Sequence, residues 1–153
     1  MTGRVIEICI AETGKLPVTR NSVAVKAGKG IVGDRYFNGE GTFSGSVKKN
    51  RESEITFIAA EEIDRFNESR GTRFGYSEFR RNVITRGVDL NALVGVEFEI
   101  AGIKFVGIDL CEPCAHLAKV LHPDVLPHLV HRGGLRAAIQ GNGRIAVDCA
   151  VET

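Results

Sequence analysis

The sequence lacks the features of several classes of protein. No apolar run among its 153 residues approaches the roughly 18 residues that a membrane-spanning helix needs. Residues 1–11 include an acidic residue and no long apolar stretch, which argues against a secretory signal. No excess of one charge is present, with 20 Lys and Arg against 19 Asp and Glu, whereas domains that coat nucleic acids are usually strongly basic. These absences predict a cytoplasmic protein that binds neither membranes nor nucleic acids.

The same sequence predicts one domain covering residues 1–153. A chain of this length that is 43% hydrophobic can bury a single core. No internal repeat or low-complexity tract divides it. Because no export signal is present, the four cysteines are expected to remain thiols in a reducing compartment. A scaffold held by disulfides is therefore the less favoured interpretation.

Local patterns predict mainly strands. Alternating or β-branched segments typical of strands lie at 4–11, 18–26, 55–60, 82–85, 96–100, 103–108 and 144–151. Helical spacing occurs at 60–69 and 114–121, in a short segment near 126–130, and in another turn or two within 133–140. About seven short strands with a few helices between them predict a mainly β protein with α additions, built as a β-barrel of about seven strands with short helices.

Two glycine-rich segments with basic side chains are candidate anion sites. In the loop at 28–45, several glycines flank Asp34 and Arg35, and exposed N–H groups beside a bidentate guanidinium suit a phosphate. In the segment HRGGLR (131–136), His131 and Arg132 precede two glycines in the same way. An ordinary surface turn with paired or solvated charges explains either segment about equally well.

A third candidate is the segment FRRN (79–82), which is followed by Arg86. The arginines form a local positive patch in a chain of balanced charge. On an extended backbone, Arg80 and Asn82 point to one face and Arg81 points to the other. The alternative is a solvated strand edge whose charges discourage pairing with another chain.

The motif CEPC (111–114) contains the candidate reactive group. Cys111 closes a predicted strand, and we expect it to be a small buried residue. Cys114 falls in the first turn of a predicted helix, where the helix dipole and nearby cations favour thiolate over thiol. A zinc site shared with the C-terminal histidines and a redox dithiol are alternatives that the spacing leaves open.

Five segments, in order along the chain, together resemble the MOSC family, the C-terminal domain of molybdenum-cofactor sulfurases and its stand-alone relatives. They are GIVGDRYFNGEGTFSG (30–45), ITFIAAE (55–61), RRNVITRGVDLNALVG (80–95), CEPCAHL (111–117) and HRGGLRA (131–137). The similarity covers about 5–147, so the chain is identified as a small stand-alone, bacterial-type member. The resemblance implies a β-barrel with small helices and binding of the molybdenum cofactor, Mo-molybdopterin.

The resemblance also implies roles for individual residues. In enzymatic relatives such as the mitochondrial amidoxime-reducing component, one cysteine ligates molybdenum, and Cys114 corresponds to it. A Phe-Arg-Pro-Asn segment that holds the pterin phosphate corresponds to 79–82, where Arg81 replaces the proline. The cofactor-binding residues that the resemblance implies are Arg35, Arg80 and Asn82. Arg86, from the local positive patch, and His131 and Arg132, from the HRGGLRA motif, are further candidates without a carried-over role.

Three functions are compatible with this resemblance. The first is a molybdenum-dependent oxidoreductase that reduces N-hydroxylated compounds, with Cys114 as the molybdenum ligand. The second is a sulfur carrier that holds a persulfide on Cys114 for assembly of a metal-sulfur centre, and the third is a cofactor-binding module without turnover. Larger relatives enclose the cofactor with an additional domain. We therefore expect a partner here: a second subunit, an electron donor, or a sulfur donor or acceptor protein.

Overall fold

The computed structural model describes residues 3–12, 15–35, 37 and 54–153, so half of the glycine-rich loop at 28–45 lies outside the described residues. The strands are β1 (Gly3–Ile10), β2 (Val18–Arg20), β3 (Ser22–Lys26), β4 (Gly30–Ile31), β5 (Ile55–Ala59), β6 (Val83–Arg86), β7 (Glu97–Ile100), β8 (Ile103–Leu110), β9 (Leu135–Ile139), β10 (Gly143–Ala146) and β11 (Ala150–Glu152). The helices are α2 (Ala60–Arg70), α3 (Ala115–Val120), α4 (Val125–His128) and the 3-10 helices η2 (Tyr76–Phe79) and η3 (Leu90–Leu93).

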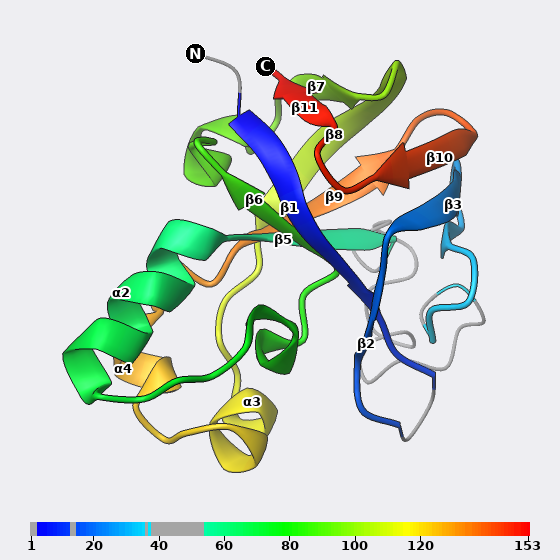
Figure 1. Ribbon diagram of the computed structural model, residues 1–153. Helices are drawn as coiled ribbons and strands as arrows, with labels where there is room; N and C mark the ends of the chain where they lie inside the picture. Colours follow the sequence, from blue (N-terminus) through cyan, green and yellow to red (C-terminus); the bar gives the residue numbers. More distant parts are fainter. Residues whose placement is uncertain (1–2, 13–14, 36, 38–53) are drawn as a thin grey trace.

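Seven strands close into a barrel in the order β7-β8-β9-β5-β6-β1-β11, because β11 pairs with both β7 and β1. Neighbouring strands run antiparallel except β5 and β6, which are parallel and are joined by a crossover containing α2. Outside the barrel, β2 pairs with the far end of β1, and β10, β3 and β4 form a small second sheet. The predicted seven-stranded barrel with short helices is confirmed (Figure 1).

The inward-facing side chains of the barrel form the larger hydrophobic core. Three aromatic rings lie at its centre: Phe57 meets Phe98 and Phe105 edge-on at centroid distances of 5.5 and 6.0 Å, and the latter two stack at 5.6 Å. Alternation of buried and less buried residues along β8 directs Ile103 and Phe105 into this core. The core therefore holds β5, β7 and β8 in a fixed register.

A second hydrophobic cluster lies between the outer face of the barrel and the helices. It joins Ile58 and Ile84, from the parallel pair, to Phe66 of α2 and Leu117 of α3. Figure 1 shows α2, α3 and α4 gathered on one side of the barrel and the small sheet on the other. No helix in the described part of the chain is long and apolar enough to cross a membrane.

Three local predictions were wrong. The segment 133–140 is strand β9 rather than helical turns, because its backbone pairs with both β5 and β8 and tertiary pairing overrides the alanine-rich spacing. The strand predicted at 18–26 is divided at the exposed Asn21 into β2 and β3. The closing strand predicted at 144–151 is divided into β10 and β11 by a turn in which Asp148 has a left-handed φ of 75°.

Candidate functional site

A buried arginine, Arg81, connects the FRRN, CEPC and HRGG segments. Its Nε donates to the carbonyl of Gly133 at 2.9 Å, and Nη2 donates to those of Cys111 and Glu112 at 3.2 and 3.3 Å. Its Nη1 donates to the carbonyl of Phe79 at 3.4 Å. Segments separated by 30 to 52 positions in the sequence therefore meet around one guanidinium.

The CEPC motif places its two cysteines in different environments. Cys111 directly follows β8, is 2% exposed, and donates its N–H to the carbonyl of Gly134. Cys114 is half-buried at the N-cap of α3, where its Sγ accepts the N–H of Leu117 at 3.5 Å. The expected burial of Cys111 is confirmed, and Cys114 lies one residue before the helix rather than in its first turn.

The backbone at FRRN is not extended as expected. Arg80 ends η2 with a left-handed φ of 62°, so the alternation of side chains fails there. Arg81 and Asn82 are both buried as a result. A non-glycine residue in this conformation costs on the order of 1–3 kcal/mol and is often found at functional sites. Arg80 also lines a pocket of about 180 Å³ together with apolar residues that include Pro17, Val120 and Leu121.

Asn82 is held by hydrogen bonds within the protein. Its Oδ1 accepts the N–H of Thr56 at 3.0 Å and the hydroxyl of Thr56 at 3.1 Å, and its Nδ2 donates to the carbonyl of Cys9 at 3.2 Å. The side chain thus connects β5, β6 and β1. A role for Asn82 in binding a phosphate stays a prediction.

Arg35 and Arg136 lie near the same end of the barrel as Asn82. The N–H of Arg35 donates to the carbonyl of Ala11, two residues after the Cys9 that Asn82 contacts. Arg136 on β9 is the register partner of Thr56 on β5. Arg136 is therefore a direct neighbour of Thr56 in the sheet, whereas for Arg35 the backbone is placed beside Ala11. Binding of an anionic ligand by these cationic residues stays a prediction.

The two glycines of HRGG are required by close packing. A Cβ at Gly133 would overlap the carbonyl oxygen of Cys111, and one at Gly134 would overlap that of Phe57. Their neighbour His131 donates its N–H to one carboxylate oxygen of Glu112 at 2.6 Å, and its Nδ1 lies 2.8 Å from the other. The HRGG and CEPC motifs are thus joined directly, and the glycines need no ligand to explain them.

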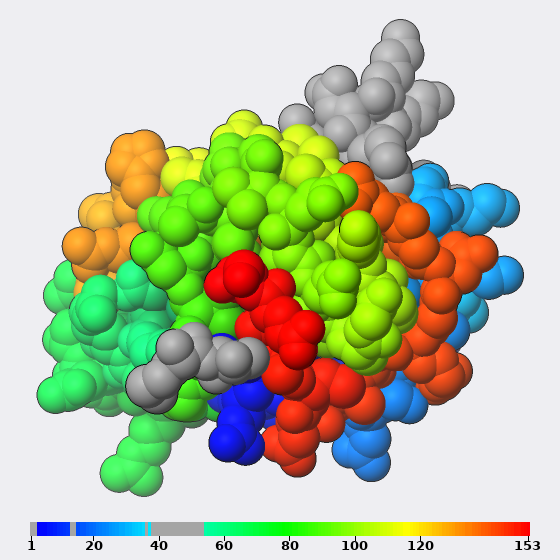
Figure 2. Space-filling view, turned by 90° about the horizontal axis from the view of Figure 1, so that it is seen from above, coloured from blue at the N-terminus to red at the C-terminus, as the bar shows by residue number. Residues whose placement is uncertain are grey.

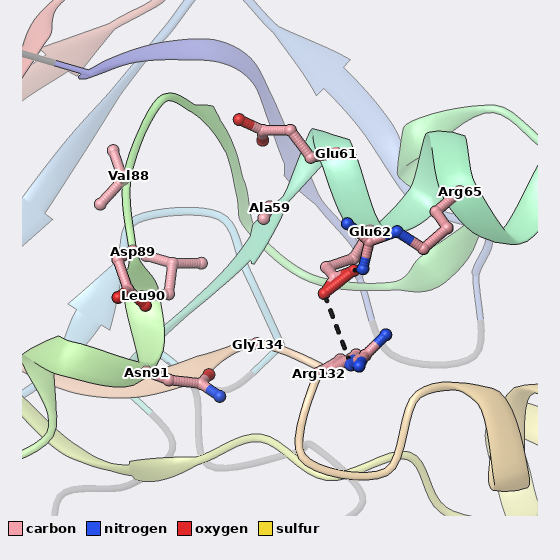
Figure 3. A pocket seen from close by; sticks show the side chains of 10 residues that line it. All are labelled: Ala59, Glu61, Glu62, Arg65, Val88, Asp89, Leu90, Asn91, Arg132 and Gly134. Atoms are coloured by element: carbon pink, nitrogen blue, oxygen red, sulfur yellow. Dashed lines mark hydrogen bonds and ion pairs between the residues drawn. The ribbon is translucent and has the colours of Figure 1, made fainter.

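Arg86 and Arg132 point to other surroundings. Arg86 donates to Asp64 at 3.0 Å and to Tyr76 at 3.1 Å, and its hydrogen bond to Asp64 raises the pKa of the guanidinium. Arg132 lines a pocket of about 230 Å³ whose wall also carries the carboxylates of Glu61, Glu62 and Asp89 (Figure 3). Arg81 thus joins the FRRN segment to the CEPC motif through the carbonyls of Cys111 and Glu112, whereas Arg86 and Arg132 lie in separate ion-pair networks. Convergence of Cys114, Arg80 and Asn82 on one ligand stays a prediction.

None of the four cysteines forms a disulfide, and the thiol of Cys9 is strongly affected by burial. Burial, followed by the nearby carboxylate of Glu7, raises the pKa of the Cys9 thiol to about 12. All four cysteines, which are all within the described part of the chain, are free thiols.

Across the described ranges, no group of three or more His, Cys, Asp and Glu side chains is placed to hold a metal ion. The zinc interpretation of CEPC thus finds no support among these residues.

Sequence reasoning missed Arg81, Thr56 and Glu112 as components of the site. Thr56 had a usable signal, since it is a lone hydroxyl inside the apolar strand β5. Arg81 could be assigned to the face opposite Arg80, but its carbonyl partners come from segments that only the fold brings together.

Comparison with known proteins identifies the family. The MOSC domain matches residues 27–152. Among solved structures, the YuaD protein from Bacillus subtilis is 20% identical with a TM-score of 0.82, covering 99% of this chain and 95% of that chain. YiiM from Geobacillus stearothermophilus is 15% identical with a TM-score of 0.70, covering 98% and 74%. YiiM from Escherichia coli is 16% identical with a TM-score of 0.68, covering 99% and 69%.

No curated protein sequence matches the chain. The structural likenesses, all at low identity, show a shared fold. The family match is independent of them and spans most of the sequence. The chain therefore belongs to the MOSC domain family.

Proposed function

We propose that this protein binds the molybdenum cofactor, with Cys114 as the metal's protein ligand, and that it is an oxidoreductase acting on N-hydroxylated compounds. When bound, the molybdenum centre would supply two electrons to an N–O bond, which with two protons yields the amine and water. The electrons would come from a partner reductase protein. The MOSC domain is associated with binding of this cofactor, which supports the first part of the proposal.

The observation that most supports this proposal is the position of Cys114. Among the four cysteines, it alone is both partly exposed and close in the fold to the FRRN segment. Cys9 and Cys111 are each 2% exposed. Cys149 is half-buried, but it lies in the turn before β11, where its carbonyl accepts the N–H of Val5. Cys114 is two residues from Glu112, whose carbonyl is held by Arg81.

The ligands that the protein offers fit a metal whose other ligands come from its cofactor. A thiolate is a soft ligand suited to molybdenum. The described residues offer one such sulfur and no group of three or more metal-ligating side chains. A pterin dithiolene would supply the missing sulfurs, and Arg35 and Arg80 would hold its phosphate through bidentate hydrogen bonds.

A persulfide carrier is the second candidate, and one contact favours it. The N–H of Leu117 lies 3.5 Å from Sγ of Cys114 and can donate to an anionic sulfur there. In this case the thiolate of Cys114 would take the outer sulfur of a persulfide on a donor protein, whose thiolate leaves, and would pass that sulfur on to an acceptor in the same way, with no metal retained. The outer sulfur would need only the partial exposure that Cys114 has.

Metal analysis of the two cysteine variants tests the proposal. Protein would be expressed in a host that makes the molybdenum cofactor, purified gently, and analysed for molybdenum and pterin. We expect molybdenum in the wild type and in Cys111→Ser, and its loss in Cys114→Ser with the fold preserved. A mass increase of one sulfur on Cys114 without molybdenum would favour the carrier. Equal retention of molybdenum in Cys114→Ser and wild type would contradict the assignment of the ligand.

A further inference from the structure

The pocket in Figure 3 lies at the carboxyl ends of the parallel strands β5 and β6. Ala59 ends β5, residues 88–91 follow β6, and Arg132 and Gly134 precede β9. In open α/β sheets, ligands bind outside the carboxyl ends of parallel strands. The volume of about 230 Å³ is below the roughly 300–1,000 Å³ of pockets for drug-sized ligands, so this pocket suits a small molecule.

One side of the pocket offers a carboxylate oxygen that lacks a donor. Oε2 of Glu61 accepts the N–H of Gly87 at 2.8 Å, which fixes the carboxylate, whereas Oε1 is buried and has no hydrogen-bond partner in the described part of the chain. Arg86 interacts with this charge electrostatically but donates to Asp64 and Tyr76 instead. A buried polar atom without a partner is rare, and a water, an ion or a ligand normally completes it.

Two further polar groups near Glu61 are also unused. The exposed carboxylate of Asp89 does not cap the helix η3 that follows it, and it forms no ion pair with a described residue. Thr85 is 0% exposed, and its hydroxyl has no hydrogen-bond partner within the described ranges. As the register partner of Ala59, Thr85 faces the same side of the sheet, so its hydroxyl lies beside the pocket floor. This side suits a cationic group with several N–H donors.

The side of the pocket across from Asp89 carries an excess of positive charge (Figure 3). Arg65 and Arg132 both form ion pairs with Glu62, with Nε of Arg132 4.0 Å from Oε2. That separation is too long for a hydrogen bond, so the guanidinium of Arg132 keeps donors for an anionic group. The positive end of the α2 dipole lies at the same place, since Ala59 is the N-cap residue and has no side-chain oxygen to cap the helix.

Apolar side chains form the floor between the two charged sides. Val88 and Leu90 line the pocket together with Ala59. The shape is held without a ligand, because Nδ2 of Asn91 donates to the carbonyl of His131 at 2.8 Å and ties the residues after β6 to the HRGG segment. A cavity with a fixed shape, opposite charges on two sides and an apolar floor favours a dipolar ligand with a short hydrocarbon body.

We propose that this pocket binds a small zwitterion whose ammonium and carboxylate groups are separated by a short hydrocarbon chain, as in the ω-amino acids. The ammonium group donates to Glu61, and Asp89 adds negative charge on that side. The carboxylate lies at Arg132 and the start of α2. The site needs neither Cys114 nor a bound metal, so it is a binding function beyond the proposed redox chemistry and is tested independently of it.

A chemical-shift titration of isotope-labelled wild-type protein with 4-aminobutyrate tests the proposal. Butylamine and butyrate are the matched ligands, because each keeps the hydrocarbon chain and lacks one of the two charges. We expect saturable shifts at the amides of Gly87, Asn91 and Gly134, with a Kd of about 1 mM for 4-aminobutyrate. Each ligand with a single charge should bind at least about tenfold more weakly.

Two substitutions assign the charges to the two sides. Glu61→Gln keeps an oxygen for the N–H of Gly87 and should weaken binding of 4-aminobutyrate about tenfold without changing the binding of butyrate. Arg132→Gln should weaken 4-aminobutyrate to a similar degree without changing the binding of butylamine. The matched controls are Glu97→Gln on β7 and Arg144→Gln on β10, which are exposed residues outside the pocket and should leave the Kd unchanged.

Three results would overturn the proposal. The first is the absence of saturable shifts with 4-aminobutyrate in the wild type, which would show that water completes the pocket. The second is binding of butylamine or butyrate as tight as that of 4-aminobutyrate, and the third is wild-type affinity in both Glu61→Gln and Arg132→Gln. The comparison of the three ligands uses wild-type protein, so it decides the proposal even if a variant fails to fold.

Discussion

Single buried polar side chains hold the motifs of this protein in place. The carboxylate of Glu54, which is 4% exposed, accepts the N–H of Ile139 at 2.9 Å and that of Gly28 at 3.2 Å. Asp34, which is 1% exposed, accepts the N–H of Ala11 at 3.0 Å. Each joins backbone far away in the sequence, as Arg81 and Asn82 do. A buried polar group of this kind is costly to truncate, because its partners then lose their hydrogen bonds.

Asn82→Ala tests this at the centre of the site. The substitution would leave the N–H of Thr56 and the carbonyl of Cys9 without the amide. We expect a loss of about 2–4 kcal/mol in the free energy of unfolding, measured by urea denaturation. The control is Asn142→Ala, which removes an exposed amide that accepts the N–H of Ala27 and should cost less than about 1 kcal/mol. Similar losses in the two variants would contradict the assignment.

The buried thiol of Cys9 predicts a pH dependence of stability. Burial raises its pKa from 9.0 to about 12 in the folded protein. Between these values the unfolded chain releases the proton and the folded protein keeps it, so stability falls as the pH rises above 9. In urea denaturation, the stability of wild type relative to Cys9→Ala should therefore decrease from pH 8 to pH 10.5. A constant difference would show that Cys9 ionises equally in both states.

At the scale of the elements, close backbone contacts decide which glycines are needed. The carbonyl of Gly107 on β8 accepts the N–H of Gly95, and its own N–H donates to the carbonyl of Val96. A Cβ at Gly107 would overlap the carbonyl of Leu93 at the end of η3. Gly107 is held by the pairing of β8 with β9, and Leu93 is held by the N–H of Val96, which donates to its carbonyl, so neither backbone can move away easily.

Gly107→Ala should therefore be strongly destabilising, by more than about 3 kcal/mol, or should prevent folding. The matched control is Gly102→Ala in the β7–β8 turn. That glycine has a φ of 78° but open space around it, so only the left-handed backbone is penalised, by about 1–2 kcal/mol. Thermal denaturation followed by circular dichroism compares the two variants. Equal melting temperatures would show that the contact at Gly107 can relax.

How far the sequence predicts each element depends on where its partners lie. The β7–β8 hairpin was predicted closely, because the alternation and the Ala101-Gly102 turn are both local. Strand β9 was predicted as helical turns, because its partners β5 and β8 come from other parts of the chain. The same distinction between local and distant partners applies to the residues of the candidate site. Burial of Cys111 and partial exposure of Cys114 follow from their local positions, whereas Arg81 meets carbonyls of two segments that are distant in the sequence.

At the scale of the whole molecule, the barrel acts as the frame for the site. The N-terminal and C-terminal strands lie side by side (Figure 1), and the C-terminal strand fills the seam between β1 and the β7–β8 hairpin (Figure 2). FRRN precedes β6, CEPC follows β8 and HRGG precedes β9. Because closure fixes the mutual positions of these strands, it also fixes the motifs attached to them.

Deletion of 150–153 tests this dependence, since it removes β11. Val151 is 1% exposed and is the register partner of both Gly3 on β1 and Ile100 on β7. Without it, two strands lose their neighbour and the core opens to water, so we expect loss of the cooperative thermal transition. Iodoacetamide should then label Cys111 as readily as Cys114, because the frame that buries Cys111 is gone. Deletion of Thr153 alone, which lies beyond β11, should leave both the transition and the labelling preference unchanged. A cooperative transition at the wild-type temperature in the longer deletion would show that the barrel and its motifs do not need closure by β11.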